Sequence, residues 1–216
     1  MPNCEQCIVK SFNSLNFLTK EELFRVSKCK TQMNIKKGEV IFEEGVVLNG
    51  VYCVREGISK LSKLSANGKD QIIKLVVKGE LLGQRSVVSN EKTNLRATAL
   101  NDMKLCFIPK KEIINDLRKN VDFSFNVLKK MSHELKEADD IIVNMSQKSV
   151  KQRLAETLIS LQKSFGTDQD GTLGILLSRE DFASIVGTAT ESAIRILSQF
   201  KKEGLISTIG KRIKIE

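Results

Sequence analysis

The chain has 216 residues, enough for one large domain or two small ones, and 41% of them are hydrophobic, enough for a packed core. Its 35 Lys and Arg against 26 Asp and Glu give a net charge of +9, which favours a polyanionic partner. Tryptophan is absent and tyrosine occurs once, so the aromatic side chains that would stack on single-stranded nucleic acid are scarce.

The positive charge is spread along the chain and does not locate a binding surface. Residues 146–216 carry a net charge of +3, and residues 1–145 carry a net charge of +6. The charge therefore supports nucleic-acid binding in general, while solubility accounts for much of the excess equally well.

The sequence carries no signal for a membrane or for export. It contains no run of about 18 apolar residues, so no membrane span is expected. The first residues, MPNCEQCIVK, lack the apolar core of a signal peptide. Five cysteines are an odd number and do not suggest a disulfide framework, so a reducing cytoplasm is the expected compartment.

Residues 1–30 begin with the pair Cys4 and Cys7 and continue into a helical segment. Thr19 and Glu22 have the spacing of a capping box, which predicts that this helix begins after Thr19.

Between residues 31 and 108 the pattern changes to short runs of Val, Ile and Leu separated by glycines. The expected strands cover residues 31–35, 39–43, 51–55, 58–64, 71–77, 95–100 and 103–109. Asn67-Gly68 lies between two of them and is a hairpin signal, because both residues tolerate positive φ. Many short strands with frequent turns predict an antiparallel barrel or jelly roll, which would enclose a pocket for an effector.

Residues 110–145 are helical in pattern, with a short helix near 110–118 and a long one from 121 to 145. In the long helix a seam of mostly apolar positions recurs at alternating spacings of three and four. The seam positions are Val121, Ser124, Leu128, Met131, Leu135, Ala138, Ile142 and Met145. This heptad pattern favours a parallel dimer, because a helix packed only within its own chain would more naturally follow a 3.6-residue period. Packing within one chain is the alternative.

The last seventy residues read as a compact helical domain with strands. Residues 146–149 interrupt the seam and are the expected hinge, and a helix follows from Val150 to near Gly166. Residues 173–177 are expected to form a short strand. Residues 205–209 and 211–215 flank Gly210 and are expected to form a two-stranded wing.

The stretch from Ser178 to Phe200 predicts two short helices joined by a tight turn at Gly187. Ser178 is the expected N-cap of the first helix, and Thr188 with Glu191 resembles a capping box that opens the second. The expected buried face of the second helix is Ala193, Ile196, Leu197 and Phe200, and the expected outward face is Glu191, Ser192, Arg195, Gln199 and Lys202. A helix-turn-helix presents such a face to the DNA major groove, although the pattern alone also fits an ordinary helical hairpin with a solvated face.

The order of these parts resembles the family of bacterial transcription factors that contains the cyclic-AMP receptor protein and the oxygen sensor of fumarate and nitrate reduction. The segments KKGEVIFEEG (36–45), GVYCVREGISKL (50–61) and KGELLG (78–83) look like the jelly roll of that family. The segment LSREDFASIVGTATESAIRIL, followed by GLISTIGKRIKI, is similar to its winged helix. The resemblance covers nearly the whole chain and implies a DNA-binding regulator with a sensor domain.

The resemblance also implies roles for residues of the second helix. Glu191 falls where the family has a glutamate that accepts from cytosine N4, and Arg195 falls where it has an arginine for guanine or phosphate. Thr190 departs from the arginine of cyclic-AMP-receptor-like members, which leaves the half-site sequence open. Ile194 is a candidate contact to a thymine methyl group or a flank of the core. The candidate phosphate contacts are Arg179, Thr188, Ser192 and Lys211.

The effector pocket departs from the cyclic-nucleotide binders of the family. Gln84 stands where they have a glutamate for the ribose hydroxyl, and Thr93-Asn94 replaces the motif whose arginine pairs with the cyclic phosphate. These losses argue against cyclic AMP. Another small anion is an alternative, with Arg85 or Arg96 as its partner; the other interpretation of both arginines is surface charge.

The cysteines match the oxygen-sensing branch only in part. Cys4 and Cys7 have the spacing of its first two ligands and Cys106 falls at its barrel ligand, but Asn13 stands near the third position. An iron–sulfur cluster normally needs four thiolates, so the sequence argues against one, although Cys29 or Cys53 could substitute. A redox-active Cys4–Cys7 pair and cysteines without such a function are the alternatives.

The sequence therefore predicts an α+β chain with three parts. These are a cyclic-nucleotide-binding-like jelly-roll sensor (1–120), a dimerisation helix with hinge (121–147) and a winged helix-turn-helix domain (148–216). The expected function is regulation of transcription by a homodimer that binds two-fold symmetric double-stranded DNA, with RNA polymerase as a further partner. An enzyme on a cupin-like barrel is disfavoured, because the single histidine, His133, lies on the long helix.

Overall fold

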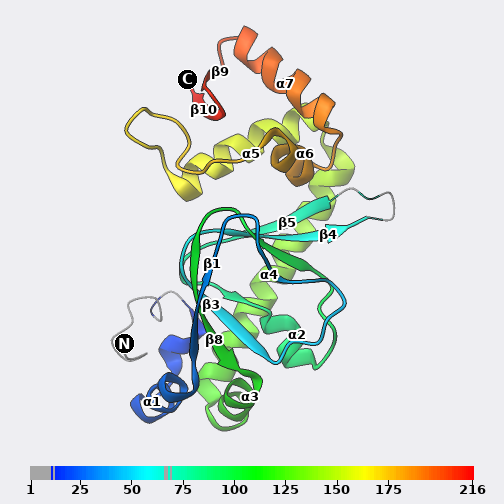
Figure 1. Cartoon of the computed structure of the whole chain (residues 1–216). Coiled ribbons are helices and arrows are strands. Elements are labelled where there is room, and N and C mark those ends of the chain that lie inside the picture. The colour runs from blue at the N-terminus through cyan, green and yellow to red at the C-terminus, as the bar shows by residue number, and fades with distance from the viewer. Residues whose placement is uncertain (1–10, 12, 66–67, 69) are drawn as a thin grey trace. The chain divides into compact units, whose positions relative to one another are not determined.

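The computed structural model of the chain describes residues 11, 13–65, 68 and 70–216 (Figure 1). The chain divides into two compact units. The first contains the described residues up to Lys63 and Ile73–Leu135, and the second contains Leu64–Ile72 and Lys136–Glu216. Among the described residues, no helix combines the length and the apolar character that crossing a membrane requires.

The strands between residues 31 and 109 form two four-stranded sheets with the orders β1-β8-β3-β6 and β2-β7-β4-β5. The strands are β1 (Thr31–Ile35), β2 (Val40–Phe42), β3 (Gly50–Glu56), β4 (Ser59–Leu64), β5 (Asp70–Val76), β6 (Leu81–Leu82), β7 (Arg96–Ala99) and β8 (Met103–Pro109). Neighbouring strands such as β3 and β8 pair antiparallel, with Val51 opposite Ile108. Every strand expected between residues 31 and 109 is present, so the predicted jelly roll is confirmed.

Two short elements of this region escaped the sequence analysis. They are the two-residue strand β6 and the helix α2 (Gln84–Ser89), which follows Gly83. Gly83 has a φ of 80°, and a Cβ there would lie 2.6 Å from Leu48 Cδ1, so both the backbone and the space favour glycine. Of the predicted hairpin dipeptide, Gly68 has a φ of 78°, whereas Asn67 lies outside the described residues.

The core of the barrel lies between the two sheets and the helices that flank them. It combines Val51 and Leu105 from one sheet, Ala97 from the other, and Phe123 from the long helix, all of them buried. Burying a side chain of this size stabilises a fold by roughly 1.5–3 kcal/mol, so this shared core fixes the first turns of the long helix against the barrel.

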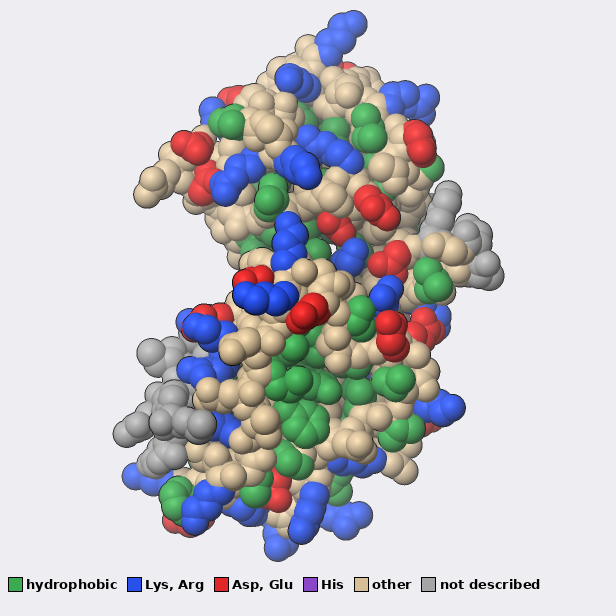
Figure 2. Space-filling model, viewed as in Figure 1, with side chains coloured by type: hydrophobic (Ala, Val, Ile, Leu, Met, Phe, Trp, Pro, Cys, Tyr) green, Lys and Arg blue, Asp and Glu red, His purple; other side chains and the backbone are tan. Residues whose placement is uncertain are grey.

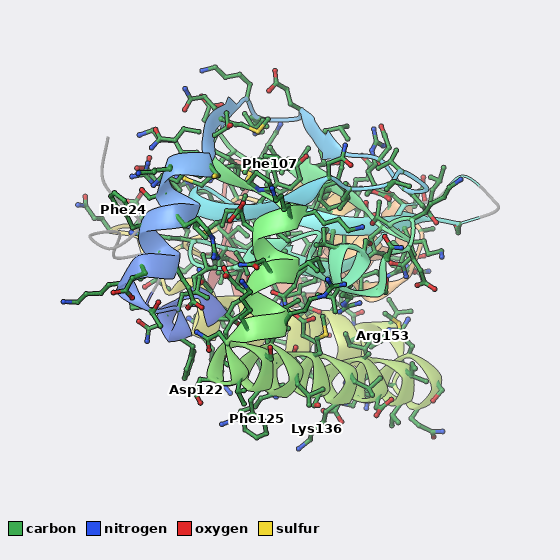
Figure 3. All side chains as sticks on the ribbon, turned by 90° about the horizontal axis from the view of Figure 1, so that it is seen from below. Phe24, Phe107, Asp122, Phe125, Lys136 and Arg153 are labelled. Atoms are coloured by element: carbon green, nitrogen blue, oxygen red, sulfur yellow. The ribbon has the colours of Figure 1, made fainter. Side chains whose placement is uncertain are left out.

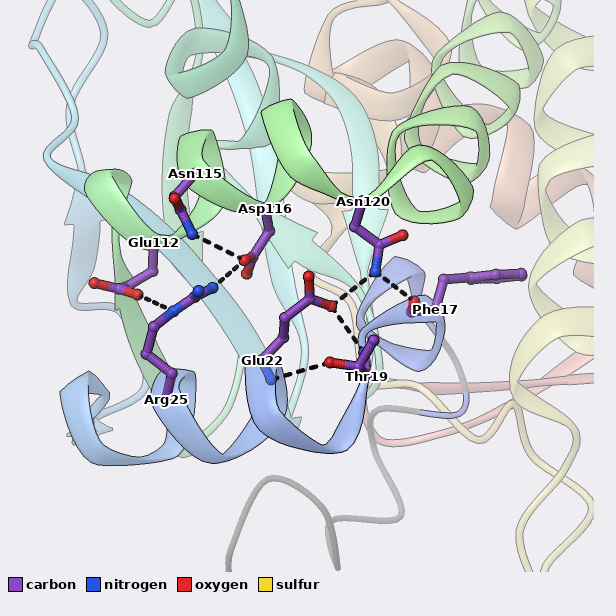
Figure 4. A network of polar contacts seen from close by, with 8 residues as sticks. All are labelled: Phe17, Thr19, Glu22, Arg25, Glu112, Asn115, Asp116 and Asn120. Atoms are coloured by element: carbon purple, nitrogen blue, oxygen red, sulfur yellow. Dashed lines mark hydrogen bonds and ion pairs between the residues drawn. The ribbon is translucent and has the colours of Figure 1, made fainter.

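Two helices pack together beside the barrel through a polar network (Figure 4). The 3₁₀ turn η3 (Ser14–Phe17) precedes helix α1 (Lys20–Cys29), and helix α3 (Lys110–Lys119) follows β8. The predicted capping box is confirmed, since Thr19 and Glu22 bond to each other's backbone N–H groups. Arg25 of α1 lies between Glu112, at 2.6 Å, and the buried Asp116 of α3. The network therefore ties the N-terminal helix to the base of the barrel.

The long helix α4 (Val121–Gln147) extends two residues beyond its predicted end. The interruption narrows to Lys148 and Ser149, and Ser149 caps the next helix in a box with Gln152. The backbone therefore changes direction only where the Ser149 side chain can replace the missing helical hydrogen bonds.

The second unit is a winged helix. Its elements are α5 (Val150–Phe165), α6 (Arg179–Val186), α7 (Thr190–Lys202), β9 (Ile206–Ile209) and β10 (Arg212–Ile215). The strands β9 and β10 pair antiparallel as the predicted wing. The strand expected over residues 173–177 was wrong. Leu173 forms only an isolated bridge to Thr167, and Ile175 and Leu177 are buried by side-chain packing rather than in a ladder.

Candidate nucleic-acid interface

The helix-turn-helix begins with a satisfied cap and turns at a left-handed glycine. Ser178 Oγ accepts from the Asp181 N–H, while the Asp181 carboxylate accepts from the Ser178 N–H, both at 3.0 Å. Gly187 closes α6 with a φ of 66°, and a Cβ there would lie 3.3 Å from Met145 Sδ. The turn that sets the direction of α7 thus depends on a residue without a side chain.

The capping box expected from Thr188 and Glu191 was wrong. The N-cap of α7 is Ala189, whose side chain offers no capping hydrogen bond. Thr188 instead donates its N–H to Ala183 O at 3.0 Å, which ties it to the end of α6. Glu191 is therefore not held by a cap, and its carboxylate is exposed in the first turn of α7.

The inward and outward faces of α7 are as the sequence predicted. Ala193, Ile196, Leu197 and Phe200 are buried. On the other face Glu191, Ile194 and Arg195 are exposed, and Thr190 and Ser192 are partly exposed. None of these outward side chains forms a hydrogen bond or ion pair with another residue that the structure describes. The donors and acceptors of this face are therefore available to an external partner.

Two candidate cations belong to α6 and to the wing, both of which contact α7. Arg179 is the first residue of α6, and burial lowers the pKa of its guanidinium, which has no ion-pair partner among the described residues. Lys211 is exposed in the turn between β9 and β10. Figure 2 shows Lys and Arg side chains on both units, in agreement with the spread of charge along the sequence.

The seam predicted for α4 is only half exposed. Leu128, Leu135 and Ile142 are 60%, 66% and 66% exposed, whereas Met131 packs against the barrel core. Ser124, Ala138 and Met145 are also only partly exposed. Phe125, which the sequence analysis missed, is 69% exposed and projects from α4 away from the barrel (Figure 3).

An exposed apolar stripe therefore runs along α4. Its members are Val121, Phe125, Leu128, Leu135 and Ile142, spaced by four, three, seven and seven residues. The predicted seam contained Ser124 instead of Phe125, because the heptad spacing alone fits either residue. We call these five residues the α4 stripe.

The candidate effector residues do not all meet at one cavity. Gln84 and Arg85 line a small cavity of about 50 Å³ inside the barrel, together with Thr93 and Asn94. Arg96 is not among the lining residues and forms an ion pair with Glu43 at 3.0 Å. The cavity has two further charged side chains, Lys74 and Glu134, that the sequence analysis did not identify.

The cysteines that the structure describes lie in different surroundings. Cys106 is buried in β8, directly opposite the buried Cys53 in β3, and Asn13 donates to Cys53 Sγ at 3.6 Å. Cys29 is exposed on α1. Cys4 and Cys7 lie outside the described residues. Within the described part of the chain, no three His, Cys, Asp or Glu side chains are grouped to hold a metal ion, and His133 is exposed on α4.

Two family models match the chain. A cyclic nucleotide-binding domain matches residues 32–120, and a Crp-like helix-turn-helix domain matches residues 152–216. The first match covers most of the barrel, and the second contains α6, α7 and the wing.

Similar proteins are bacterial regulators. The fumarate and nitrate reduction regulatory protein of Escherichia coli is 28% identical over 99% of this chain and 86% of its own length. The anaerobic regulatory protein of Haemophilus influenzae is 28% identical over 99% of this chain and 84% of its own length.

Solved structures share the fold. The c-di-GMP responsive global regulator CLP of Xanthomonas campestris aligns with a TM-score of 0.79 at 16% identity, over 91% of this chain and 99% of its own. A CRP/FNR-family transcriptional regulator from Eubacterium rectale aligns with a TM-score of 0.77 at 20% identity, over 93% and 92%.

Proposed function

Because the chain belongs to the CRP/FNR family of bacterial transcription regulators and is a DNA-binding regulator of that type, we propose that it acts as a homodimer. This homodimer binds a two-fold symmetric site in double-stranded DNA through its two α7 helices. We further propose that its barrel does not respond to cyclic AMP.

The observation that carries the proposal is the free outward face of α7. Its charged residues Glu191 and Arg195 are exposed, and neither is engaged by a neighbour that the structure describes. A helix anchored by four buried apolar side chains on one face presents the other face in a fixed orientation, as major-groove recognition requires.

Base reading is assigned to three side chains of this face. The Glu191 carboxylate suits the N4 donor of cytosine, the Arg195 guanidinium suits guanine O6 and N7 or a phosphate, and Ile194 suits a thymine methyl group. Thr190 lies in the same turn with a short hydroxyl, so it contacts fewer atoms than an arginine there would. The half-site of this protein therefore differs from one read by an arginine at that position.

Backbone positioning is assigned to residues around α7. Arg179 and Lys211 offer cationic donors at the first residue of α6 and at the tip of the wing. Thr188 and Ser192 are partly exposed near the start of α7, where hydroxyl groups can donate to phosphate oxygens. These contacts would fix the register of α7 without reading sequence.

The α4 stripe supports the homodimer. Its side chains are apolar and exposed over five helical turns, and a second copy of the same stripe is the partner whose heptad spacing matches. A dimer also supplies the second α7 that a two-fold symmetric site needs. Regulation then follows from its position on the promoter, with RNA polymerase as the partner acted on.

The cavity supports the absence of a cyclic-AMP response. A volume of about 50 Å³ is far below the roughly 300–1,000 Å³ of small-molecule sites. Neither Gln84 nor Thr93-Asn94 supplies the carboxylate and the arginine that the cyclic-nucleotide binders use.

The test is selection of genomic fragments by the purified full-length chain, without added nucleotide, followed by footprinting of the enriched sites. We expect an inverted repeat whose half-sites are one helical turn apart, and no change when cyclic AMP is added. Enrichment without two-fold symmetry would contradict the dimer, and no enrichment at all would contradict DNA binding by this form of the protein.

A further inference from the structure

Glu134 extends from α4 into the cavity of the barrel and bonds to both of the basic side chains that line it. Lys74 Nζ lies 3.1 Å from Glu134 Oε1, and Arg85 Nε and Nη2 each lie 3.3 Å from Glu134 Oε2. Lys74 comes from β5 and Arg85 from α2, so one carboxylate joins the sheet, the short helix and the long helix.

The charges of this cluster balance without an outside ion. Lys74 Nζ also lies 2.8 Å from Glu80 Oε1, so two cations, Lys74 and Arg85, face two carboxylates, Glu80 and Glu134. Burial alone would raise the pKa of Glu134, but the Lys74 ammonium and the Arg85 guanidinium outweigh it and hold that pKa below its ordinary value. Burial would likewise lower the pKa of Lys74, and Glu80 and Glu134 raise it instead.

The space that Glu134 leaves in the cavity is small. The side chain of Glu134 is only 19% exposed, and the cavity beside it holds about 50 Å³, room for a few waters. An incoming phosphate or carboxylate would have to displace the Glu134 carboxylate from Arg85 and Lys74.

We propose that Glu134 is a built-in anionic ligand of the barrel cavity, which ties α4 to the barrel and keeps the protein competent for DNA without a diffusible effector. The part of this inference that concerns DNA binding rests on the proposed function. The part that makes Glu134 an internal ligand concerns the barrel alone. Because Glu134 belongs to the helix that carries the α4 stripe, its ion pairs in the cavity would hold that helix to the barrel without a bound effector.

The test removes the internal carboxylate and supplies a free one. Glu134→Ala leaves Lys74 and Arg85 facing a space the size of a small carboxylate, so acetate should bind the variant and not the wild type. The matched control is Asp140→Ala, an exposed acid of the same helix with no ion pair to any residue that the structure describes. Binding is measured without DNA, by the acetate-dependent rise in Tm and by titration calorimetry, with chloride as the counter-ion control at equal ionic strength.

The second readout is DNA affinity. Coupling between two sites is typically worth roughly 5–150-fold, so we expect Glu134→Ala to bind its DNA site at least about tenfold more weakly, with acetate restoring most of the loss. The added variant Glu134→Ala with Arg85→Ala should bind no acetate and show no rescue. If Glu134→Ala proves unfolded by circular dichroism, Glu134→Gln, which keeps the volume and removes the charge, should show the same loss of affinity.

Three outcomes would overturn the inference. They are a Glu134→Ala protein that binds acetate no better than the wild type, a folded variant with unchanged DNA affinity, and an Asp140→Ala control with the same loss. A wild-type protein that bound no DNA would instead sink the proposed function, and the acetate titration would still decide whether Glu134 is the internal ligand.

Discussion

Among the α7 residues proposed to contact DNA, we expect Glu191 to influence specificity most, because its carboxylate can only accept hydrogen bonds. Whether this carboxylate is free depends on how the start of α7 is capped. Had Thr188 and Glu191 closed a capping box, the carboxylate would have been turned back toward the backbone, but the helix begins at Thr190 without a side-chain cap. The exposed carboxylate is free to accept from a base amino group.

Replacing Glu191 with alanine should relax the preference at one base pair of each half-site. The lost acceptor is worth about 1–3 kcal/mol of discrimination, whereas contacts to phosphates are untouched. Competition binding against half-sites varied one base pair at a time measures this directly. Glu180→Ala, an exposed acid of α6, is the control for the change in charge. A uniform change in affinity over all variants would speak against base reading by Glu191.

Gly187 is the residue on which the geometry of the turn depends. Its φ of 66° costs an alanine roughly 1–2 kcal/mol, and the new Cβ would also press on Met145 Sδ at 3.3 Å. Gly187→Ala should therefore lower the free energy of unfolding by more than Gly204→Ala, measured by urea denaturation. Gly204 is a matched control, since its φ is 74° and a Cβ there meets nothing within 4 Å. Equal losses of unfolding free energy in the two variants would mean that the structure relieves the contact with Met145 at no cost in stability.

At the scale of elements, α4 has one apolar side that packs on the barrel and another that carries the α4 stripe. The heptad pattern did not separate the two sides. Phe123 and Val127 are buried against the barrel, and Met131 packs on the same core. The α4 stripe lies on another side of the helix. The heptad pattern fits residues of both sides, because the buried row and the α4 stripe lie less than half a turn apart around the helix axis.

Leu135→Lys should convert the proposed dimer to monomers without unfolding the chain. Leu135 is 66% exposed in the single chain, so a lysine there costs the monomer little, but it would place a charge in the centre of the paired stripes. Sedimentation velocity across a concentration series gives the oligomeric state. Asp140→Lys serves as the control, because it adds a lysine outside the α4 stripe. A Leu135→Lys protein that sediments like the wild type would exclude the stripe as the dimer contact.

The short elements are where the local sequence pattern failed to predict the secondary structure. Apart from the two-residue strand β6, the strands and long helices that the structure describes follow from periodicity and glycine placement and lie within a few residues of the expected positions. The helix α2 spans six residues, too few for an amphipathic period. Residues 173–177 have the composition of a strand, but Leu173 forms only an isolated bridge to Thr167 and a single backbone hydrogen bond to Ile213 O of β10.

At the scale of the whole molecule, the sequence predicts the order of domains and the reading helix but not the ion cluster in the barrel. Glu134 lies 60 residues from Lys74 and 49 residues from Arg85 in the chain. No local period relates them, since the contact exists only after the sheets, α2 and α4 have assembled. Arg96 illustrates the converse, because it lies near Arg85 in sequence and yet pairs with Glu43 outside the cavity lining.

The net charge of +9 predicts how DNA affinity depends on salt. Each phosphate neutralised by a lysine or arginine contributes about −0.9 to the slope of log K against log salt, so a dimer with several such contacts binds far more weakly at about 200 mM than at about 50 mM salt. Lys211→Ala removes one contact from each protomer and should make the slope shallower by about two, with a similar loss of affinity on every sequence. Glu191→Ala should leave the slope unchanged, because a contact to a base releases no counter-ion. Fluorescence anisotropy across a salt series measures both variants, and an unchanged slope for Lys211→Ala would remove the tip of the wing from the phosphate-binding surface.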